Sequence, residues 1–127
     1  MSNFLVIEKK LKNFDKKISV SGDKSISIRW VLLASIASGV SKAQNLLISE
    51  DVIAAIKAVR KLGIKVTLKG KFCKIYGKGL DGYRYKESLT INAENSGTLG
   101  RLIMGLLIDA PYKIKIIGDK SLSKRDF

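Results

Sequence analysis

Three residues near the start of the chain, Lys24, Ser25 and Arg29, have types and spacing that suit the binding of an anion. They follow Gly22 and open an apolar-periodic segment, so they would lie at a helix start. The unpaired N–H groups of a helix start carry partial positive charge and bind phosphate or carboxylate. Lys24 would add a point charge, Ser25 a hydroxyl donor, and Arg29, on the same helix face as Ser25, a planar fork. The alternative is that Ser25 caps the helix while both cations are solvated.

A second turn offers a similar arrangement with different residues. Asn95, Gly97 and Thr98 belong to a tight loop after an expected strand. Arg101 lies one turn into the helix that follows. Glycine lets the backbone approach a ligand closely, and the helix start again favours an anion. An Asn/Ser/Gly turn with Thr98 as the helix cap explains the same residues without a ligand.

The third turn repeats the first. Residues 118–125 share with residues 22–29 a glycine, an aspartate, a lysine, a serine, an aliphatic residue, a second serine and an arginine, all in register. A chance match is one explanation in a chain rich in lysine and serine. The other is that both segments form the same structural motif, in which a strand leads into a helix start flanked by cations. Arg29, Arg101 and Arg125 would then stand near three helix starts, an arrangement that a ligand with two or more anionic groups would require.

Composition agrees with a small anionic ligand. The 127 residues include 24 lysines and arginines against 11 acids, a formal net charge of +13, and 46% of them are hydrophobic. These values are typical of one globular domain or part of one, and not of a disordered tail. The excess of lysine can also be explained without a ligand, because a high net charge keeps a protein soluble. A nucleic-acid-binding module would interleave aromatic with basic residues, which this chain does not, so nucleic acid is not expected as a partner.

Metal and cysteine chemistry are not expected. Cys73 is the only cysteine and the chain has no histidine, so these residues offer no internal disulfide, zinc site or Cys/His nucleophile. Asp51, Asp109 and Asp119 read as capping or surface acids, and no acid–base pair stands out. A lone thiol suits the reducing cytosol, and no apolar stretch resembles a signal peptide or a membrane span. We therefore expect a cytoplasmic protein without a membrane segment, whose site is better equipped for binding than for a complete mechanism.

The pattern of apolar residues predicts the α/β elements that would position these turns. Apolar residues at helical spacing predict helices, over residues 25–38, 49–62 and 98–108. Alternating apolar residues predict strands, in short pieces within 4–20 and over 64–68, 72–76, 88–93 and 112–117, with a hairpin across 69–71. Gly39 would end the first helix and Ser49 would cap the second. The sequence stops before the last expected helix completes a turn, which predicts that it is truncated.

Taken together, the three turns resemble the signature motifs of the 5-enolpyruvylshikimate-3-phosphate synthase family. The match comprises Ser21-Gly22-Asp23-Lys24-Ser25-Ile26-Ser27 with Arg29, Asn95-Ser96-Gly97-Thr98 with Arg101, and Gly118-Asp119-Lys120-Ser121-Leu122 with Arg125. All three occur in the order and at the spacing of the family. The resemblance implies transfer of the enolpyruvyl group of phosphoenolpyruvate to the 5-hydroxyl of shikimate 3-phosphate, with release of phosphate and without a cofactor.

The resemblance also implies which residues would bind phosphoenolpyruvate. Lys24 resembles a ligand that lies close to the reacting groups, and hence a catalytic residue. Arg125 resembles a direct ligand of phosphoenolpyruvate. Asn95, Gly97 and Thr98 correspond to the segment that forms part of the phosphoenolpyruvate pocket.

Other roles and the fold follow from the same resemblance. Ser25 and Arg29 resemble ligands of shikimate 3-phosphate, and Arg101 a supporting cation near the phosphoenolpyruvate pocket. The family fold has two similar domains built from repeated βαβαββ units, an inside-out α/β barrel. Residues 1–20 would belong to or cross from the other domain, and residues 21–127 would form the first part of the amino-terminal domain. The remainder of the enzyme would supply the acid–base residues, so the chain alone is expected to be inactive.

Three positions depart from the family pattern. Ile28 stands where a polar residue commonly precedes the arginine, and Asp126 stands where a proline usually follows. Glu94 replaces a glycine, which adds negative charge beside the expected phosphoenolpyruvate pocket and removes the conformational freedom of glycine.

Three other interpretations remain open. The related transferase that acts on UDP-N-acetylglucosamine would show a different first motif and a loop cysteine, whereas Cys73 lies in an expected hairpin. A non-catalytic remnant of the synthase would keep the motifs without the activity. A basic nucleic-acid-binding module would explain the charge without any enzyme.

Overall fold

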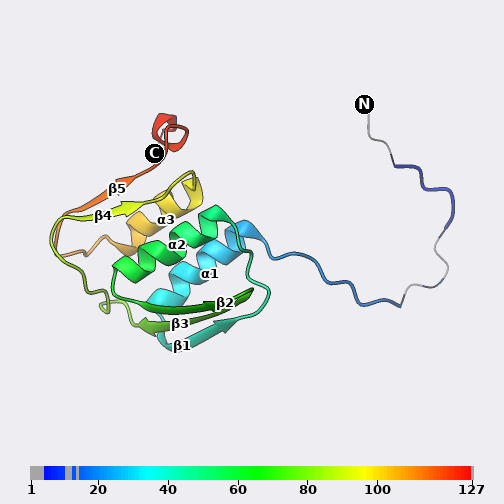
Figure 1. Ribbon diagram of the computed structural model, residues 1–127, viewed down its shortest axis with the longest axis horizontal. Helices are drawn as coiled ribbons and strands as arrows, with labels where there is room; N and C mark the ends of the chain where they lie inside the picture. The colour runs from blue at the N-terminus through cyan, green and yellow to red at the C-terminus, as the bar shows by residue number, and fades with distance from the viewer. Residues whose placement is uncertain (1–4, 11–12, 14, 127) are drawn as a thin grey trace.

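The computed structural model describes residues 5–10, 13 and 15–126. Within them the chain forms helices, strands and one 3-10 helix, which are labelled in Figure 1. In chain order the elements are α1 (Lys24–Ile36), β1 (Ser38–Ala43), α2 (Glu50–Lys61), β2 (Lys65–Lys69), β3 (Phe72–Lys78), β4 (Leu89–Asn92), α3 (Gly97–Leu106), β5 (Ile114–Ile117) and the 3-10 helix η1 (Leu122–Lys124).

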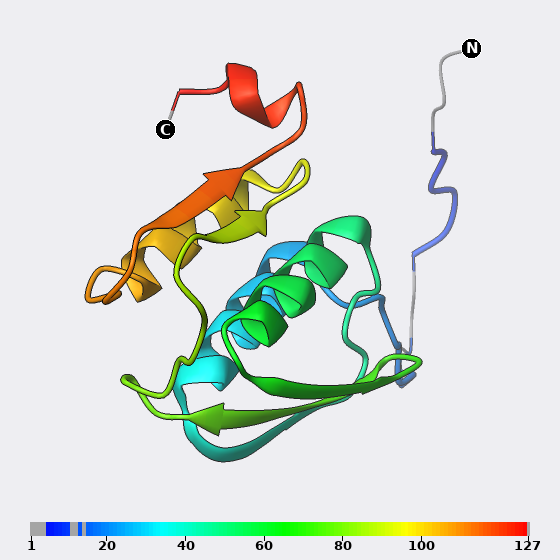
Figure 2. The same ribbon diagram turned by 60° about the vertical axis from the view of Figure 1, so that its left-hand side comes forward.

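The strands form two separate sheets. β1, β3 and β2 make an antiparallel sheet in that order, while β4 and β5 make a parallel pair. α1 and α2 lie against the three-stranded sheet, and α3 with the β4–β5 pair lies beyond them (Figures 1 and 2). The order α1-β1-α2-β2-β3 matches the last five elements of a βαβαββ unit, and β4-α3-β5 matches the first three of the next. The α/β class expected from the sequence is confirmed.

The core lies where α1 and α2 meet the three-stranded sheet. Ile28 and Val31 of α1, Val59 of α2 and Ile75 of β3 are fully buried. A second part of the same core holds β4 and α3 against the other helices, through buried side chains such as Ile91. Burial of this aliphatic surface is the main term that holds the elements together.

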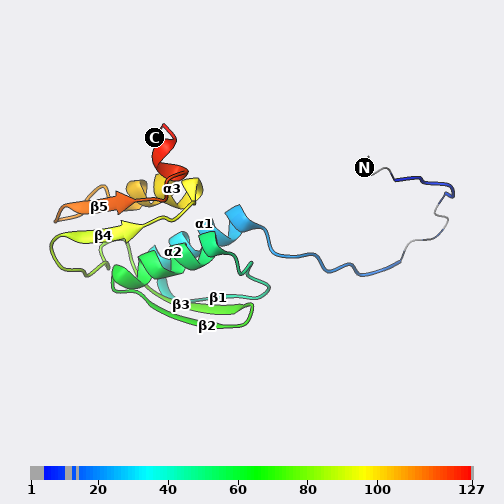
Figure 3. The ribbon, with the colours of Figure 1, turned by 45° about the horizontal axis from the view of Figure 1, so that its top comes forward.

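All three α-helices begin at the same end of the molecule. In Figures 1 and 3 the first turns of α1, α2 and α3 lie on the right, and β4 and β5 also run towards that end. The helix starts, with their partial positive charge, are therefore gathered on one side. The turns that the sequence marks for anion binding lie on this side because each follows or precedes one of these elements.

Several predicted elements are confirmed with small shifts of their ends. α2 is capped by Ser49, whose Oγ accepts a hydrogen bond from the backbone of Val52 at 3.4 Å. The hairpin of β2 and β3 is antiparallel, as predicted. β4, α3 and β5 all lie within the predicted segments, apart from the first residue of α3, Gly97.

The first helix ends differently from the prediction. α1 stops at Ile36, and its C-cap is Ala37, whose N–H donates to the carbonyl of Leu33 at 3.1 Å. Gly39 is not the C-cap and instead lies in β1, with φ of +93°. β1 was not predicted, because its sequence SGVSKA lacks regular alternation and its strand conformation depends on pairing with β3.

The short strands predicted within residues 4–20 are absent from the residues of that segment which the structure describes. Residues 5–10, 13 and 15–20 form no helix or strand, and Leu5 and Ile7 are more than four-fifths exposed. A strand needs a neighbour to receive its hydrogen bonds, and none lies beside this segment in Figure 1. Phe4 and Phe14 lie outside the described residues. In the described part of the chain no helix has the length and apolarity needed to cross a membrane.

Candidate anion-binding site

Asp23 caps the start of α1. Its Oδ1 accepts a hydrogen bond from the backbone N–H of Ile26 at 2.7 Å. The sequence suggested Ser25 for this role, but Ser25 is the second residue of the helix and is half-buried. Gly22 lies directly against the carbonyl of Asn45, where a Cβ would clash. These contacts leave the Ser25 hydroxyl free of the capping role and fix the first turn of α1.

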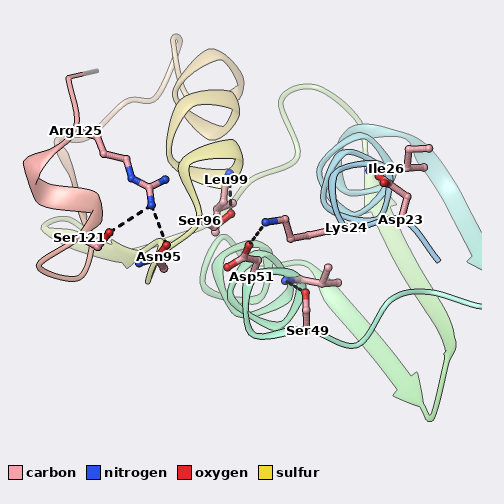
Figure 4. Close-up of polar contacts among 11 residues, drawn as sticks. Asp23, Lys24, Ile26, Ser49, Asp51, Asn95, Ser96, Leu99, Ser121 and Arg125 are labelled. Atoms are coloured by element: carbon pink, nitrogen blue, oxygen red, sulfur yellow. Dashed lines mark hydrogen bonds and ion pairs between the residues drawn. The ribbon is translucent and has the colours of Figure 1, made fainter. Parts of the chain in front are cut away.

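Lys24 forms an ion pair that joins α1 to α2. Its Nζ lies 3.1 Å from Oδ2 of Asp51, and the side chains of Lys24 and Asp51 are 54% and 17% exposed. Figure 4 shows Lys24 reaching from α1 towards Asp51 in the first turn of α2. Asp51 therefore does more than favour the helix dipole, which is the role the sequence suggested.

Arg29 lies one turn into α1 and is exposed. Within the described part of the chain its guanidinium has neither a hydrogen bond nor an ion pair with another side chain. It borders a cavity of about 210 Å³ whose other walls are leucines of α1 and α3, among them Leu33 and Leu102. A cation that is both exposed and without a protein partner is available to an anionic ligand.

The second turn is built around Ser96 at the start of α3. Ser96 is 2% exposed, and its Oγ accepts a hydrogen bond from the N–H of Leu99 at 3.2 Å. Ser96, not Thr98, is thus the helix cap, and Thr98 is half-buried in the first turn. Two residues before the cap, Glu94 has φ of +52°. That left-handed conformation suits the glycine that the family pattern has at this position.

The third turn repeats the aspartate hydrogen bond of the first. Oδ1 of Asp119 accepts a hydrogen bond from the N–H of Leu122 at 2.7 Å, as Asp23 does from Ile26. The similarity of residues 22–29 and 118–125 is therefore one of local structure as well as sequence. The element that follows differs, because Leu122–Lys124 is only a 3-10 helix.

The second and third turns lie side by side because β4 and β5 pair. The N–H of Ala93 donates to the carbonyl of Ile117, and the N–H of Asp119 donates to the carbonyl of Glu94, both at 2.8 Å. Arg125 completes the connection, since its Nη2 donates to Oδ1 of Asn95 at 3.0 Å (Figure 4). Parallel pairing thus brings together residues thirty positions apart in sequence.

Gly97 leaves space for Arg125 at the start of α3. A Cβ at position 97 would lie 3.4 Å from Nη1 of Arg125, at the short limit of ordinary van der Waals contact. Nη2 meanwhile contacts Asn95 and, at 3.4 Å, Oγ of Ser121. One edge of the guanidinium is therefore held by the protein, while Nη1 faces the first turn of the helix.

Asp119 is linked to this arginine through Asn95. Its Oδ2 accepts a hydrogen bond from Nδ2 of Asn95 at 2.7 Å. That bond, followed by the backbone N–H of Leu122, holds the pKa of Asp119 below its usual value of 3.8, and the charge of Arg125 adds to the effect. Arg101 lies close by, and its Nη2 donates to the carbonyl of Asp126 at 2.7 Å.

The structure thus brings together Asn95, Gly97 and Arg125, which the sequence had placed in separate motifs. Lys24, Ser25 and Arg29 all lie in the first two turns of α1. Sequence reasoning missed the roles of two acids: Asp51, which pairs with Lys24, and Asp119, which holds Asn95. The only advance signal was their position beside a helix start. No group of three or more potential metal ligands occurs among the described residues.

These observations define the class of protein. It is an α/β protein that gathers helix starts, glycine turns and cations at one end, where they can bind an anion with more than one charged group. The sequence model of the EPSP synthase (3-phosphoshikimate 1-carboxyvinyltransferase) family matches residues 8–126. The chain therefore belongs to the EPSP synthase family.

Individual relatives agree. The chain is 43% identical over 120 residues to a 3-phosphoshikimate 1-carboxyvinyltransferase of Thermoanaerobacter, covering 94% of this chain and 28% of the relative. It is 46% identical over 108 residues to that of Streptococcus pyogenes serotype M2, covering 85% and 25%. The solved EPSP synthase from Acinetobacter baumannii superposes with a TM-score of 0.75 at 35% identity, covering 87% and 25%. The chain thus spans about a quarter of the length of these relatives.

Proposed function

We propose that this chain carries part of the active site that transfers the enolpyruvyl group of phosphoenolpyruvate to the 5-hydroxyl of shikimate 3-phosphate, with release of phosphate. The observation that carries the proposal is the meeting of Arg125, Asn95 and Gly97 at the start of α3. Local structure does not require an arginine to face a helix start across a glycine. A ligand with a phosphate and a carboxylate does, because each group gains charge-assisted hydrogen bonds there.

Phosphoenolpyruvate is assigned to the side where Lys24 and Arg125 supply the cations. Nη1 of Arg125 lies beside Gly97 in the first turn of α3, whose first N–H groups have no helical partners, so one anionic group would bind there. Lys24 would bind a second anionic group and lie near the reacting atoms. Thr98 and Arg101 support this pocket from the first and second turns of α3.

Shikimate 3-phosphate is assigned to the start of α1. Ser25 offers a hydroxyl and Arg29 an exposed planar fork on the same helix face. Asp23 rather than Ser25 caps the helix, which supports a ligand role for the Ser25 hydroxyl.

The complete reaction needs groups beyond those found in these residues. An acid–base pair is not identifiable here, and the chain spans about a quarter of its relatives. We therefore assign it binding and not turnover on its own, without a cofactor, with the rest of the enzyme as its partner. Residues 1–20, with exposed Leu5 and Ile7, would pair with the other domain, and residues 21–127 would begin the amino-terminal domain. The buried free thiol of Cys73 supports a cytoplasmic location.

Titration of the chain by NMR with each ligand tests this proposal. The variants Lys24→Ala and Arg125→Ala are expected to lose phosphoenolpyruvate binding by about tenfold or more, since each removes a charged hydrogen-bond donor. Lys86→Ala is the control, because Lys86 is exposed, lies outside all three turns, and its replacement removes the same charge. The assignment is refuted if Lys24→Ala and Arg125→Ala bind phosphoenolpyruvate as tightly as Lys86→Ala does. Tight, steeply salt-dependent binding of duplex DNA in preference to both ligands would point to a nucleic-acid-binding module instead.

A further inference from the structure

The side-chain amide of Asn95 is bonded at both of its ends. Nδ2 donates to Oδ2 of Asp119 at 2.7 Å, and Oδ1 accepts from Nη2 of Arg125 at 3.0 Å. A carboxylate only accepts hydrogen bonds and a guanidinium only donates them. Both neighbours therefore demand the same orientation of the amide, with its oxygen towards the arginine.

The hydrogen bond between Asp119 and the first residue of η1 does not explain why Asp119 also contacts Asn95. That bond, from the N–H of Leu122, uses Oδ1 of Asp119, just as the cap of α1 uses Oδ1 of Asp23. In the described part of the chain the second carboxylate oxygen of Asp23 makes no hydrogen bond, so a cap of this kind is complete with one oxygen. Oδ2 of Asp119 is thus engaged in a second task that the otherwise similar first turn lacks.

We propose that Asp119 is a positioning residue that, through Asn95, sets the direction of the Arg125 guanidinium. The proposal rests on the proposed function, in which Arg125 binds phosphoenolpyruvate. Asp119 is itself fixed, because its N–H donates to the carbonyl of Glu94 at 2.8 Å. The order of dependence runs from the backbone of the second turn to Asp119, from Asp119 to Asn95, and from Asn95 to Nη2 of Arg125.

The consequence for binding lies in which nitrogen of Arg125 stays available. Nη2 is occupied by Asn95 and Ser121, whereas Nη1 faces Gly97 at the start of α3. A guanidinium held along one edge presents its other nitrogen in a fixed direction, which lowers the entropy lost when an anion binds. Asp119 achieves this without touching the ligand or the arginine.

Asp119→Asn tests the proposal most directly. Asparagine accepts a backbone hydrogen bond at a helix start as well as aspartate does. Its amide has only one oxygen, however, so when that oxygen accepts from the N–H of Leu122, an NH₂ group faces Nδ2 of Asn95. Asn95 is expected to turn its amide and present Nδ2 to Arg125, where two donors would oppose each other. Asp23→Asn makes the same change at the matching cap and is the control for capping and for net charge.

Two readouts separate this inference from the proposed function. Without ligand, ¹⁵N relaxation of Nε of Arg125 should report an ordered side chain in the wild type and in Asp23→Asn, and a mobile one in Asp119→Asn. With ligand, Asp119→Asn should bind phosphoenolpyruvate about tenfold more weakly, with binding of shikimate 3-phosphate changed less than about twofold. In the double variant Asn95→Asp with Asp119→Asn, the donor and acceptor are exchanged, and the order of Arg125 should return.

The inference is overturned if Arg125 is equally ordered in Asp119→Asn and wild type, or if Asp23→Asn causes the same loss. It is also overturned if phosphoenolpyruvate binding falls in Arg125→Ala and is unchanged in Asp119→Asn. Absence of phosphoenolpyruvate binding in the wild-type chain would count against the proposed function alone, since the relaxation experiment needs no ligand.

Discussion

Replacement of Glu94 by glycine should stabilise the protein, although it removes a side chain. Glu94 is exposed and has φ of +52°, in the left-handed region. That conformation costs a residue with a Cβ about 1–2 kcal/mol. Glycine avoids this cost but loses about 0.5–1 kcal/mol through the greater freedom of the unfolded chain. The middle values of the two ranges predict a net gain of about 0.75 kcal/mol in the free energy of unfolding for Glu94→Gly.

Urea unfolding of three variants separates conformation from charge. Glu94→Ala removes the same carboxylate but keeps the strained backbone, so its stability should stay close to that of the wild type. Glu87→Gly is the matched control, because Glu87 is exposed and its φ is not among the positive values. It should be destabilised by about 0.5–1 kcal/mol, through the unfolded state alone.

The ranking of the variants decides the outcome. We expect Glu94→Gly to have a higher urea midpoint than wild type, Glu94→Ala an equal one and Glu87→Gly a lower one, all with the same m-value. A Glu94→Gly variant no more stable than Glu94→Ala would refute the strain. A gain shared by both variants would assign the effect to the carboxylate.

Two further predictions concern the cations of the site. Asp51→Asn breaks the ion pair with Lys24, whereas the control Glu50→Gln removes a charge from the same helix turn and leaves the pair intact. Urea unfolding should show that Asp51→Asn lowers the free energy of unfolding by less than about 1 kcal/mol more than Glu50→Gln does. Gly97→Ala should weaken phosphoenolpyruvate binding and spare shikimate 3-phosphate, because its Cβ would lie 3.4 Å from Nη1 of Arg125. The control Gly105→Ala in the same helix meets no atom within 4 Å and should gain up to about 1 kcal/mol of stability without loss of binding, as measured by NMR titration and urea unfolding.

The elements that the sequence predicts well are those with local signals. α2 has a serine cap, acids in its first turn and an apolar stripe, so it depends little on the rest of the chain. The hairpin of β2 and β3 turns at Gly70, whose φ of +54° requires a residue of this kind. β1 was missed because its partners in β3 lie thirty to forty positions away, and pairing over that range has no local signature.

In the candidate site, too, the residues with local sequence signals could be predicted and those that depend on long-range contacts could not. The motifs containing Lys24, Asn95 and Arg125 can be recognised in sequence because glycine, a cap and a cation occur within a few residues. Their acidic partners cannot, since Asp51 reaches Lys24 only when α1 packs on α2, and Asp119 reaches Asn95 only when β5 pairs with β4. Choosing Asp23 over Ser25 as the cap needed the backbone, because both residues are good caps.

The two acids support their cations in different ways, and this has consequences for ligand binding. Asp51 contacts Lys24 directly, so an anion that binds Lys24 must compete with a carboxylate that is only 17% exposed. Asp119 acts on Arg125 through a neutral amide that occupies Nη2 and leaves Nη1 to the ligand. Arg125 can therefore bind an anion in the position it already has, whereas Lys24 must share or leave its partner. Under the proposed function, phosphoenolpyruvate would therefore meet an Arg125 that is already positioned, whereas engagement of Lys24 would require the ligand to displace Asp51.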